Sequence, residues 1–133
     1  MSFNFNYIKQ FEKQIILKKI GIRGQKKIFN SKILVVGAGG LGSPVIDLLV
    51  RAGVGFLGVI EDDKVDYSNL HRQTLYDYND VGKYKSDVIK KKIKLINDKI
   101  KLKIFKERAN DKNLGKILPK FDIIVDGTDN FLS

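Results

Sequence analysis

The feature that most restricts the fold is a short apolar run that leads directly into a glycine-rich turn. Residues 32–36 read KILVV, the next seven read GAGGLGS, and apolar residues then recur at helical spacing as far as Gly53. A continuous apolar run of this length is typical of a strand that is buried on both faces of a sheet. The order of strand, glycine turn and helix predicts the first unit of a parallel α/β sheet.

The same alternation continues through the rest of the chain. Further strands are expected at 56–60, 101–105 and 121–125, separated by helical patterns that start at Ser86 and at Leu114. We expect Ser86 to cap its helix. Right-handed crossovers make the four strands the first half of a Rossmann-like, doubly wound, mostly parallel sheet. In the usual order, the first and fourth strands flank the switch point, where ligands bind beyond the carboxyl ends of the strands.

A helical extension is expected ahead of the sheet, at residues 1–31. Apolar residues recur at helical spacing from Ile8 to Ile16, and Gly21 is expected to end this helix. A shorter helix is expected after Gly24. The extension therefore consists of two helices in this prediction.

The second predicted part is a Rossmann-like domain at residues 32–133. The chain ends at Ser133, directly beyond a buried strand, where a crossover helix would begin. Natural domains rarely end at such a point, because a sheet edge would be left uncovered. We therefore interpret the domain as truncated at its C-terminus.

The composition is that of one folded domain. With 43% hydrophobic and 30% charged residues among 133, the chain can bury a core. The absence of cysteine excludes a disulfide framework, a thiolate zinc site and a cysteine nucleophile within these residues. No apolar run approaches the roughly 18 residues of a membrane span, and the N-terminus lacks an apolar signal region. We expect a cytoplasmic protein with no membrane partner.

The net charge of +10 raises the question of nucleic-acid binding. Of the 25 basic residues, 21 are lysines, whereas bidentate readers of bases and phosphates are rich in arginine. The sequence therefore favours a solvated lysine surface over a nucleic-acid interface. Such a surface would also attract an acidic protein partner.

The glycine turn itself predicts a nucleotide site. Gly37, Gly39 and Gly42 match GxGxxG directly after a strand and at the start of a helix. This pattern allows a tight turn and a close approach of the backbone to a phosphate at the helix N-terminus. Glu61 ends the second strand, 24 residues after Gly37, where a carboxylate can accept hydrogen bonds from a ribose. NAD and ATP both fit at this point.

A polar stretch after the second strand favours a polyphosphate over a nicotinamide. Its cations and amides are Asn69, Arg72, Gln73 and Lys85. These donors suit phosphate groups whose charge grows during a reaction, whereas a nicotinamide needs an apolar slot. Asp126 and Asp129 follow the fourth strand and are expected to face the same crevice. A carboxylate there could hold Mg²⁺ against phosphate oxygens.

In order and spacing, GAGGLGS, EDDKVDYSNLHRQTLY, VGKYK and DGTDN together resemble the ThiF/MoeB/HesA family, relatives of the ubiquitin-activating enzymes. The resemblance runs from FEKQIIL at residues 11–17 to Asn130, and SNLxRQ with DxTDN is far more specific than the glycine motif. Members of this family adenylate the C-terminal glycine of a small ubiquitin-like sulfur carrier (ThiS/MoaD-like), using MgATP and releasing pyrophosphate. The resemblance implies an adenylyltransferase of thiamine or molybdopterin synthesis.

The resemblance also implies a role for each matched residue. The nucleotide-binding residues it implies are Gly37, Gly39, Gly40, Gly42, Glu61, Asp63, Asn69, Arg72, Gln73, Lys85 and Asp129. Of these, Arg72, Lys85 and Asp129 would also be catalytic, and Asp129 would position Mg²⁺. Glu61, which would take the ribose, stands where the family usually has aspartate. Lys13 stands where the family has an arginine that reaches the ATP of a partner subunit, which implies a homodimer.

Two other functions stay open at this point. One is an NAD(P)-binding oxidoreductase domain, which the glycine turn and Glu61 would also serve. The other is a catalytically incomplete fragment of the same family that acts only as a binding module. Zinc is expected only if a segment beyond Ser133 carries the family's paired CxxC motifs.

Overall fold

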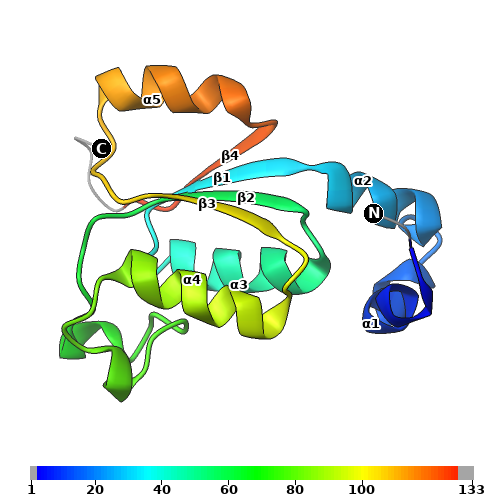
Figure 1. The fold of residues 1–133 in the computed structure, drawn as a ribbon, viewed down its shortest axis with the longest axis horizontal. Coiled ribbons are helices and arrows are strands. Elements are labelled where there is room, and N and C mark those ends of the chain that lie inside the picture. Colours follow the sequence, from blue (N-terminus) through cyan, green and yellow to red (C-terminus); the bar gives the residue numbers. More distant parts are fainter. Residues whose placement is uncertain (1–2, 129–133) are drawn as a thin grey trace.

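The computed structural model describes residues 3–128. Its centre is a four-stranded parallel sheet in the order β3-β2-β1-β4 (Figure 1). The strands are β1 (Lys32–Val36), β2 (Phe56–Ile60), β3 (Lys101–Phe105) and β4 (Ile123–Asp126). This order confirms the predicted Rossmann-like half-sheet and places the switch point between β1 and β4.

Helices cover both faces of the sheet. Helices α3 (Gly42–Ala52) and α4 (Lys85–Ile96) lie on one face, and α5 (Asp111–Ile117) lies on the other (Figure 1). Successive residues of a strand point to opposite faces. In β1, Ile33 and Val35 therefore join the larger core cluster, while Leu34 and Val36 join the smaller cluster on the α5 side. This two-sided burial explains the continuous apolar run in the sequence.

The N-terminal helices α1 (Phe5–Ile15) and α2 (Gly21–Asn30) lie at the end of the molecule opposite the carboxyl ends of the strands (Figure 1). The buried side chain of Gln25 holds them there: its Nε2 donates to the backbone oxygen of Ala52 at 3.1 Å and to the Tyr7 hydroxyl at 3.3 Å. The extension therefore packs against the C-terminal end of α3.

The helix boundaries differ from the sequence prediction at both glycines of the extension. The first helix ends at Ile15, and Gly21 begins the second helix instead of ending the first. Gly24 lies inside α2. Gly21 has a positive φ of 58°, so it reverses the chain direction and lets the next helix start at once.

The boundaries of three later elements also need correction. Helix α4 begins at Lys85, and Ser86 lies inside it, buried, so Ser86 is not the cap. Helix α5 begins at Asp111, because the side chain of Asn110 accepts a hydrogen bond from the Asn113 N–H and caps the helix three residues before the predicted start. Strand β4 begins two residues later than predicted and includes Asp126.

The segment between β2 and α4 forms two short 3-10 helices, η1 (Tyr67–Asn69) and η2 (Tyr78–Asp80). The Lys92 ammonium on α4 anchors it, through ion pairs with Asp77 at 3.2 Å and Asp80 at 2.7 Å. A third 3-10 helix, η3 (Leu118–Lys120), precedes β4.

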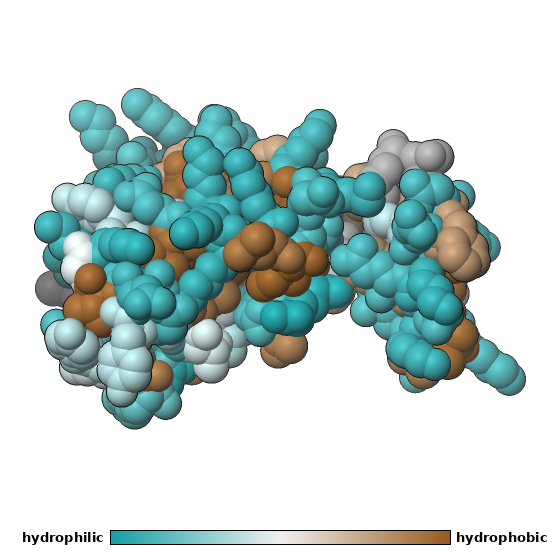
Figure 2. Space-filling view, turned by 60° about the horizontal axis from the view of Figure 1, so that its bottom comes forward, coloured by the Kyte–Doolittle hydropathy of each residue, from teal (hydrophilic) through white to brown (hydrophobic). Residues whose placement is uncertain are grey.

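The face that carries α3 and α4 is largely hydrophilic in Figure 2. Exposed apolar side chains on these helices include Leu48 and Leu95. Within residues 3–128, none of the helices combines the length and apolar character that crossing a bilayer requires.

Candidate functional site

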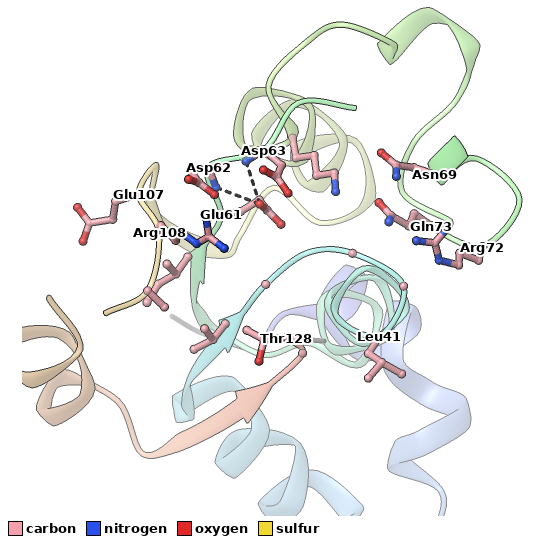
Figure 3. Close-up of a pocket in the computed structure, with 18 residues that line it drawn as sticks. Leu41, Glu61, Asp62, Asp63, Asn69, Arg72, Gln73, Glu107, Arg108 and Thr128 are labelled. Atoms are coloured by element: carbon pink, nitrogen blue, oxygen red, sulfur yellow. Dashed lines mark hydrogen bonds between the residues drawn. The ribbon is translucent and has the colours of Figure 1, made fainter. Parts of the chain in front are cut away.

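A pocket of about 570 Å³ opens at the carboxyl ends of the strands (Figure 3). Its walls are the glycine turn after β1, the ends of β2 and β3, the connector before α4, and residues 127–128 after β4. This is the switch point that the strand order predicts. The pocket therefore joins segments that lie far apart in the sequence.

The glycine turn has a backbone geometry that side chains would prevent. Gly37 has a φ of +88°, and its N–H donates to the Ile60 oxygen at 2.9 Å. A Cβ on Gly42 would lie only 1.7 Å from the Gly37 oxygen, because the start of α3 packs directly against the turn. Gly42 is therefore required for this close approach.

The peptides on either side of Ala38 are held by two buried side chains. Glu61 Oε1 accepts from the Ala38 N–H at 2.8 Å, and the Tyr76 hydroxyl donates to the Ala38 oxygen at 2.6 Å. Glu61 Oε2 accepts from the N–H groups of Asp62 and Asp63, each at 3.0 Å (Figure 3). Glu61 thus ties the end of β2 to the glycine turn, and its contact with a ribose stays a prediction.

Tyr76 is a hydrogen-bond donor in this arrangement. Burial raises the pKa of its hydroxyl far above the ordinary value, and the negative charge of Glu61 raises it further. The hydroxyl therefore keeps its proton at neutral pH.

Arg72 and Gln73 lie against the glycine turn. The Arg72 Nε is 3.2 Å from the position that a Cβ on Gly40 would take, and Nη1 donates to the Ser68 oxygen at 2.9 Å. Gln73 is 3% exposed, and its Oε1 has no hydrogen-bond partner within residues 3–128. A buried amide that lacks a partner and lines a pocket indicates a polar ligand.

Lys85 brings a buried positive charge to the same wall. It is 4% exposed, and its Nζ lies 5.7 Å from the centre of the Tyr76 ring. No carboxylate of residues 3–128 lies within 4 Å of this ammonium. Because a buried charge is costly without a counter-charge, Lys85 indicates an anionic ligand in the pocket.

Of the other predicted residues, Asn69 and Asp63 also line the pocket. Lys13 does not: it lies on α1, at the opposite end of the sheet, and its side chain is 88% exposed. A role for Lys13 in the pocket of a partner subunit stays a prediction. Asp129 lies outside the described residues, although Gly127 and Thr128 just before it line the pocket.

Asp126 does not line the pocket, so its predicted place in the crevice is wrong. It is the last residue of β4, and its Oδ1 accepts from the N–H and the hydroxyl of Thr128, at 3.0 and 2.6 Å. These hydrogen bonds lower the pKa of the Asp126 carboxyl. The carboxylate fixes the turn that follows the strand instead of facing a ligand.

Two residues of the site, Tyr76 and Arg108, carried no predicted role. Tyr76 came within the family motif but received no role. Arg108, on the loop after β3, points toward Glu61, whereas its neighbour Glu107 points away (Figure 3). The signal that could have found Arg108 is its position just after a strand, because all the parallel strands end at the edge of the sheet where the pocket lies.

The fold and the site define an α/β protein with a polar pocket, lined by side chains of both charges, at the switch point of a Rossmann-like sheet. The chain belongs to the ThiF family, whose model matches residues 11–133.

Similar proteins include a "Probable molybdopterin-synthase adenylyltransferase" of Gracilaria tenuistipitata var. liui, 44% identical over 94% of this chain and 35% of the relative. A "Sulfur carrier protein adenylyltransferase" of Thermus thermophilus is 43% identical over 92% of this chain and 45% of its own length. The crystal structure of E. coli MccB with ATP is 35% identical, with a TM-score of 0.75 over 80% of this chain and 32% of that one. The chain thus spans less than half the length of each.

Proposed function

We propose that the protein adenylates the C-terminal glycine of a small ubiquitin-like sulfur carrier, with ATP as the second substrate. The observation that carries the proposal is the buried ammonium of Lys85, which has no carboxylate partner among residues 3–128 and lines a pocket beside the glycine turn. The names of the two adenylyltransferase relatives support the same reaction.

The residues of the pocket fit a nucleoside triphosphate. Gly40 leaves room for Arg72, since a Cβ there would lie 3.2 Å from the Arg72 Nε. The Gln73 Oε1 is an acceptor with no partner within the described chain, and a hydroxyl or amino group of a nucleotide could donate to it. The structure of MccB with ATP, a protein 35% identical to this chain, supports ATP as the ligand. An NAD(P)-dependent oxidoreductase would use the glycine turn and Glu61, but it would leave Arg72 and Lys85 without a role.

In the proposed reaction, a carboxylate oxygen of the carrier's terminal glycine attacks the α-phosphorus of ATP. The bond from this phosphorus to the oxygen that bridges to the β-phosphate breaks, pyrophosphate leaves, and an acyl adenylate forms. Arg72 and Lys85 would stabilise the negative charge that grows on the phosphate oxygens, and Asn69 and Gln73 would orient them. Because the carboxylate is the nucleophile, the protein needs no nucleophilic side chain.

Three further parts of the proposal concern groups outside the described pocket. Asp129 would hold Mg²⁺, which supplies positive charge to the phosphate oxygens when bound. Lys13 would contribute to the pocket of a partner subunit in a homodimer, since α1 keeps it far from the pocket of its own chain. The carrier would serve molybdopterin or thiamine synthesis in the cytoplasm.

The test is ATP–pyrophosphate exchange by the full-length enzyme, measured with and without carriers that end in Gly-Gly. We expect exchange that depends on the carrier. Asp129→Ala should lower its rate on the order of 10²–10³-fold, as loss of an electrostatic participant does. Asp98→Ala, which removes an exposed carboxylate in the turn after α4, is the control and should leave exchange unchanged.

Two results would contradict this proposal. If a folded full-length enzyme shows no pyrophosphate exchange with any of the carriers that end in Gly-Gly, the proposed reaction is wrong. Near-normal exchange by the Asp129→Ala variant removes Asp129 from the mechanism. Calorimetry provides a separate comparison, since tighter binding of NADH than of MgATP favours the oxidoreductase.

A further inference from the structure

Tyr76 contacts both halves of the candidate anion site. It comes from the connector before α4, and it is 5% exposed. Its hydroxyl donates to the Ala38 oxygen at 2.6 Å, within the glycine turn. The face of its ring lies 5.7 Å from the Lys85 Nζ. A phenol that only filled the core would need neither contact.

The hydrogen bond to Ala38 controls the direction of a backbone donor. The Ala38 carbonyl and the Gly39 N–H belong to one planar, trans peptide unit, so they point in opposite directions. When Tyr76 holds the carbonyl, it also fixes the Gly39 N–H. Gly39 lines the pocket, and within residues 3–128 its N–H has no hydrogen-bond acceptor. Glu61 fixes the preceding peptide unit through the Ala38 N–H.

The ring gives Lys85 a partner that does not neutralise it. A cation over an aromatic face is attracted by the negative face of the ring, which holds the ammonium in place while its charge stays available to an anion. Since burial keeps the Tyr76 hydroxyl protonated, the same side chain can donate to the turn and support the lysine together.

We propose that Tyr76 is a positioning residue that sets the Gly39 N–H and the Lys85 ammonium for the same phosphate group. The inference rests on the proposed nucleotide function of the pocket and assigns the recognition of the 5′-phosphate to this arrangement. It predicts that a change at Tyr76 alters the affinity for ligands that carry a phosphate and does not alter the affinity for the nucleoside.

The test compares the binding of ATP, AMP and adenosine to the full-length protein by calorimetry. Tyr76→Phe keeps the ring beside Lys85 and removes the hydroxyl; we expect Kd for ATP and AMP to rise about tenfold, the effect of one well-placed hydrogen bond. The Kd for adenosine should stay within about twofold, because adenosine carries no phosphate. Tyr78→Phe makes the same change at a tyrosine that is 79% exposed, and it should alter none of the three.

A second measurement keeps the hydroxyl and therefore the fold. With 3-fluorotyrosine at position 76, the ¹⁹F resonance should shift on addition of AMP and stay in place with adenosine. Equal weakening of all three ligands by Tyr76→Phe, no weakening at all, or a resonance that ignores AMP would overturn the inference while the wild type still binds ATP. A wild-type protein that does not bind ATP would overturn the proposed function and this inference with it.

Discussion

At the scale of single residues, Gly42 is where the fold leaves the least room. A Cβ there would lie 1.7 Å from the Gly37 oxygen and 2.7 Å from its carbon. We expect Gly42→Ala to lower the free energy of unfolding by at least about 2 kcal/mol, because backbone must move to relieve the clash. Urea unfolding measures the loss. Gly115→Ala is the control, since nothing lies within 4 Å of its Cβ position in α5; it should be neutral or stabilising by up to about 1 kcal/mol.

At Lys85, in contrast to Gly42, we expect a substitution to spare the stability of the protein and to remove its function. The residue is 4% exposed, and its ammonium has no carboxylate within 4 Å among the described residues, so an anionic ligand would supply a counter-charge that these residues do not. We expect Lys85→Met to leave the nucleotide-free protein as stable as the wild type or more stable, by about 0.5–2 kcal/mol, and to abolish ATP binding. Urea unfolding without nucleotide and calorimetry with ATP measure the two effects. A clear loss of stability would contradict the idea that the charge is unpaired.

At the scale of elements, the connector before α4 depends on a pH-sensitive anchor. The hydrogen bond from Lys92 lowers the pKa of Asp77 below its ordinary value. A carboxyl whose folded pKa is lowered stabilises the fold above its unfolded pKa of about 3.9, and this contribution disappears as the pH falls through the folded value. We therefore expect the connector to loosen below about pH 4.

Hydrogen exchange of the connector amides between pH 7 and pH 3, corrected for intrinsic rates, checks this expectation. The Lys92→Met variant removes the anchor and should show weaker protection at pH 7 with a flatter pH dependence. Lys94→Met alters an exposed lysine of the same helix, for which the described residues give no ion pair, and it should behave as the wild type does. Equal pH profiles for all three proteins would contradict the anchor.

At the scale of the whole molecule, we expect the 133 residues to bind a nucleotide without catalysing the carrier-dependent reaction efficiently. The pocket walls come from the ends of β1 and β2, the loop after β3, the connector and the residues after β4, so a nucleotide would contact the whole carboxyl edge of the sheet. At 100 times Kd, MgATP should stabilise the 133-residue chain by about 2.7 kcal/mol, or on the order of 10 °C in Tm for a domain of this size. Carrier-dependent exchange by this chain alone should be weak or absent, since it spans less than half of its relatives.

A thermal scan with and without MgATP measures the first effect, and pyrophosphate exchange measures the second. An unchanged Tm at saturating MgATP would count against the pocket as a nucleotide site. Robust exchange by the 133 residues alone would contradict the separation of binding from turnover.

The architecture was predictable from the sequence because the pattern of a doubly buried strand is local. Strands β1, β2 and β3 have the predicted bounds. In β1 and β2 the apolar run is buried on both faces and ends at polar turns. Helix starts were less predictable. Ser86 has the chemistry of a cap, but packing buries it inside α4, and the capping contact of Asn110 depends on the local turn.

The sequence by itself determined which residues form the strands and the glycine turn, because periodicity and glycine sterics act over a few neighbouring residues. Only the tertiary structure decided how that site is held together. Ala38 is hydrogen-bonded to Glu61 and Tyr76, which lie 23 and 38 residues further along the chain. The Asp126 carboxylate accepts a hydrogen bond from Thr128 and does not line the pocket. Such contacts depend on where parallel strands end in space, which no local pattern encodes.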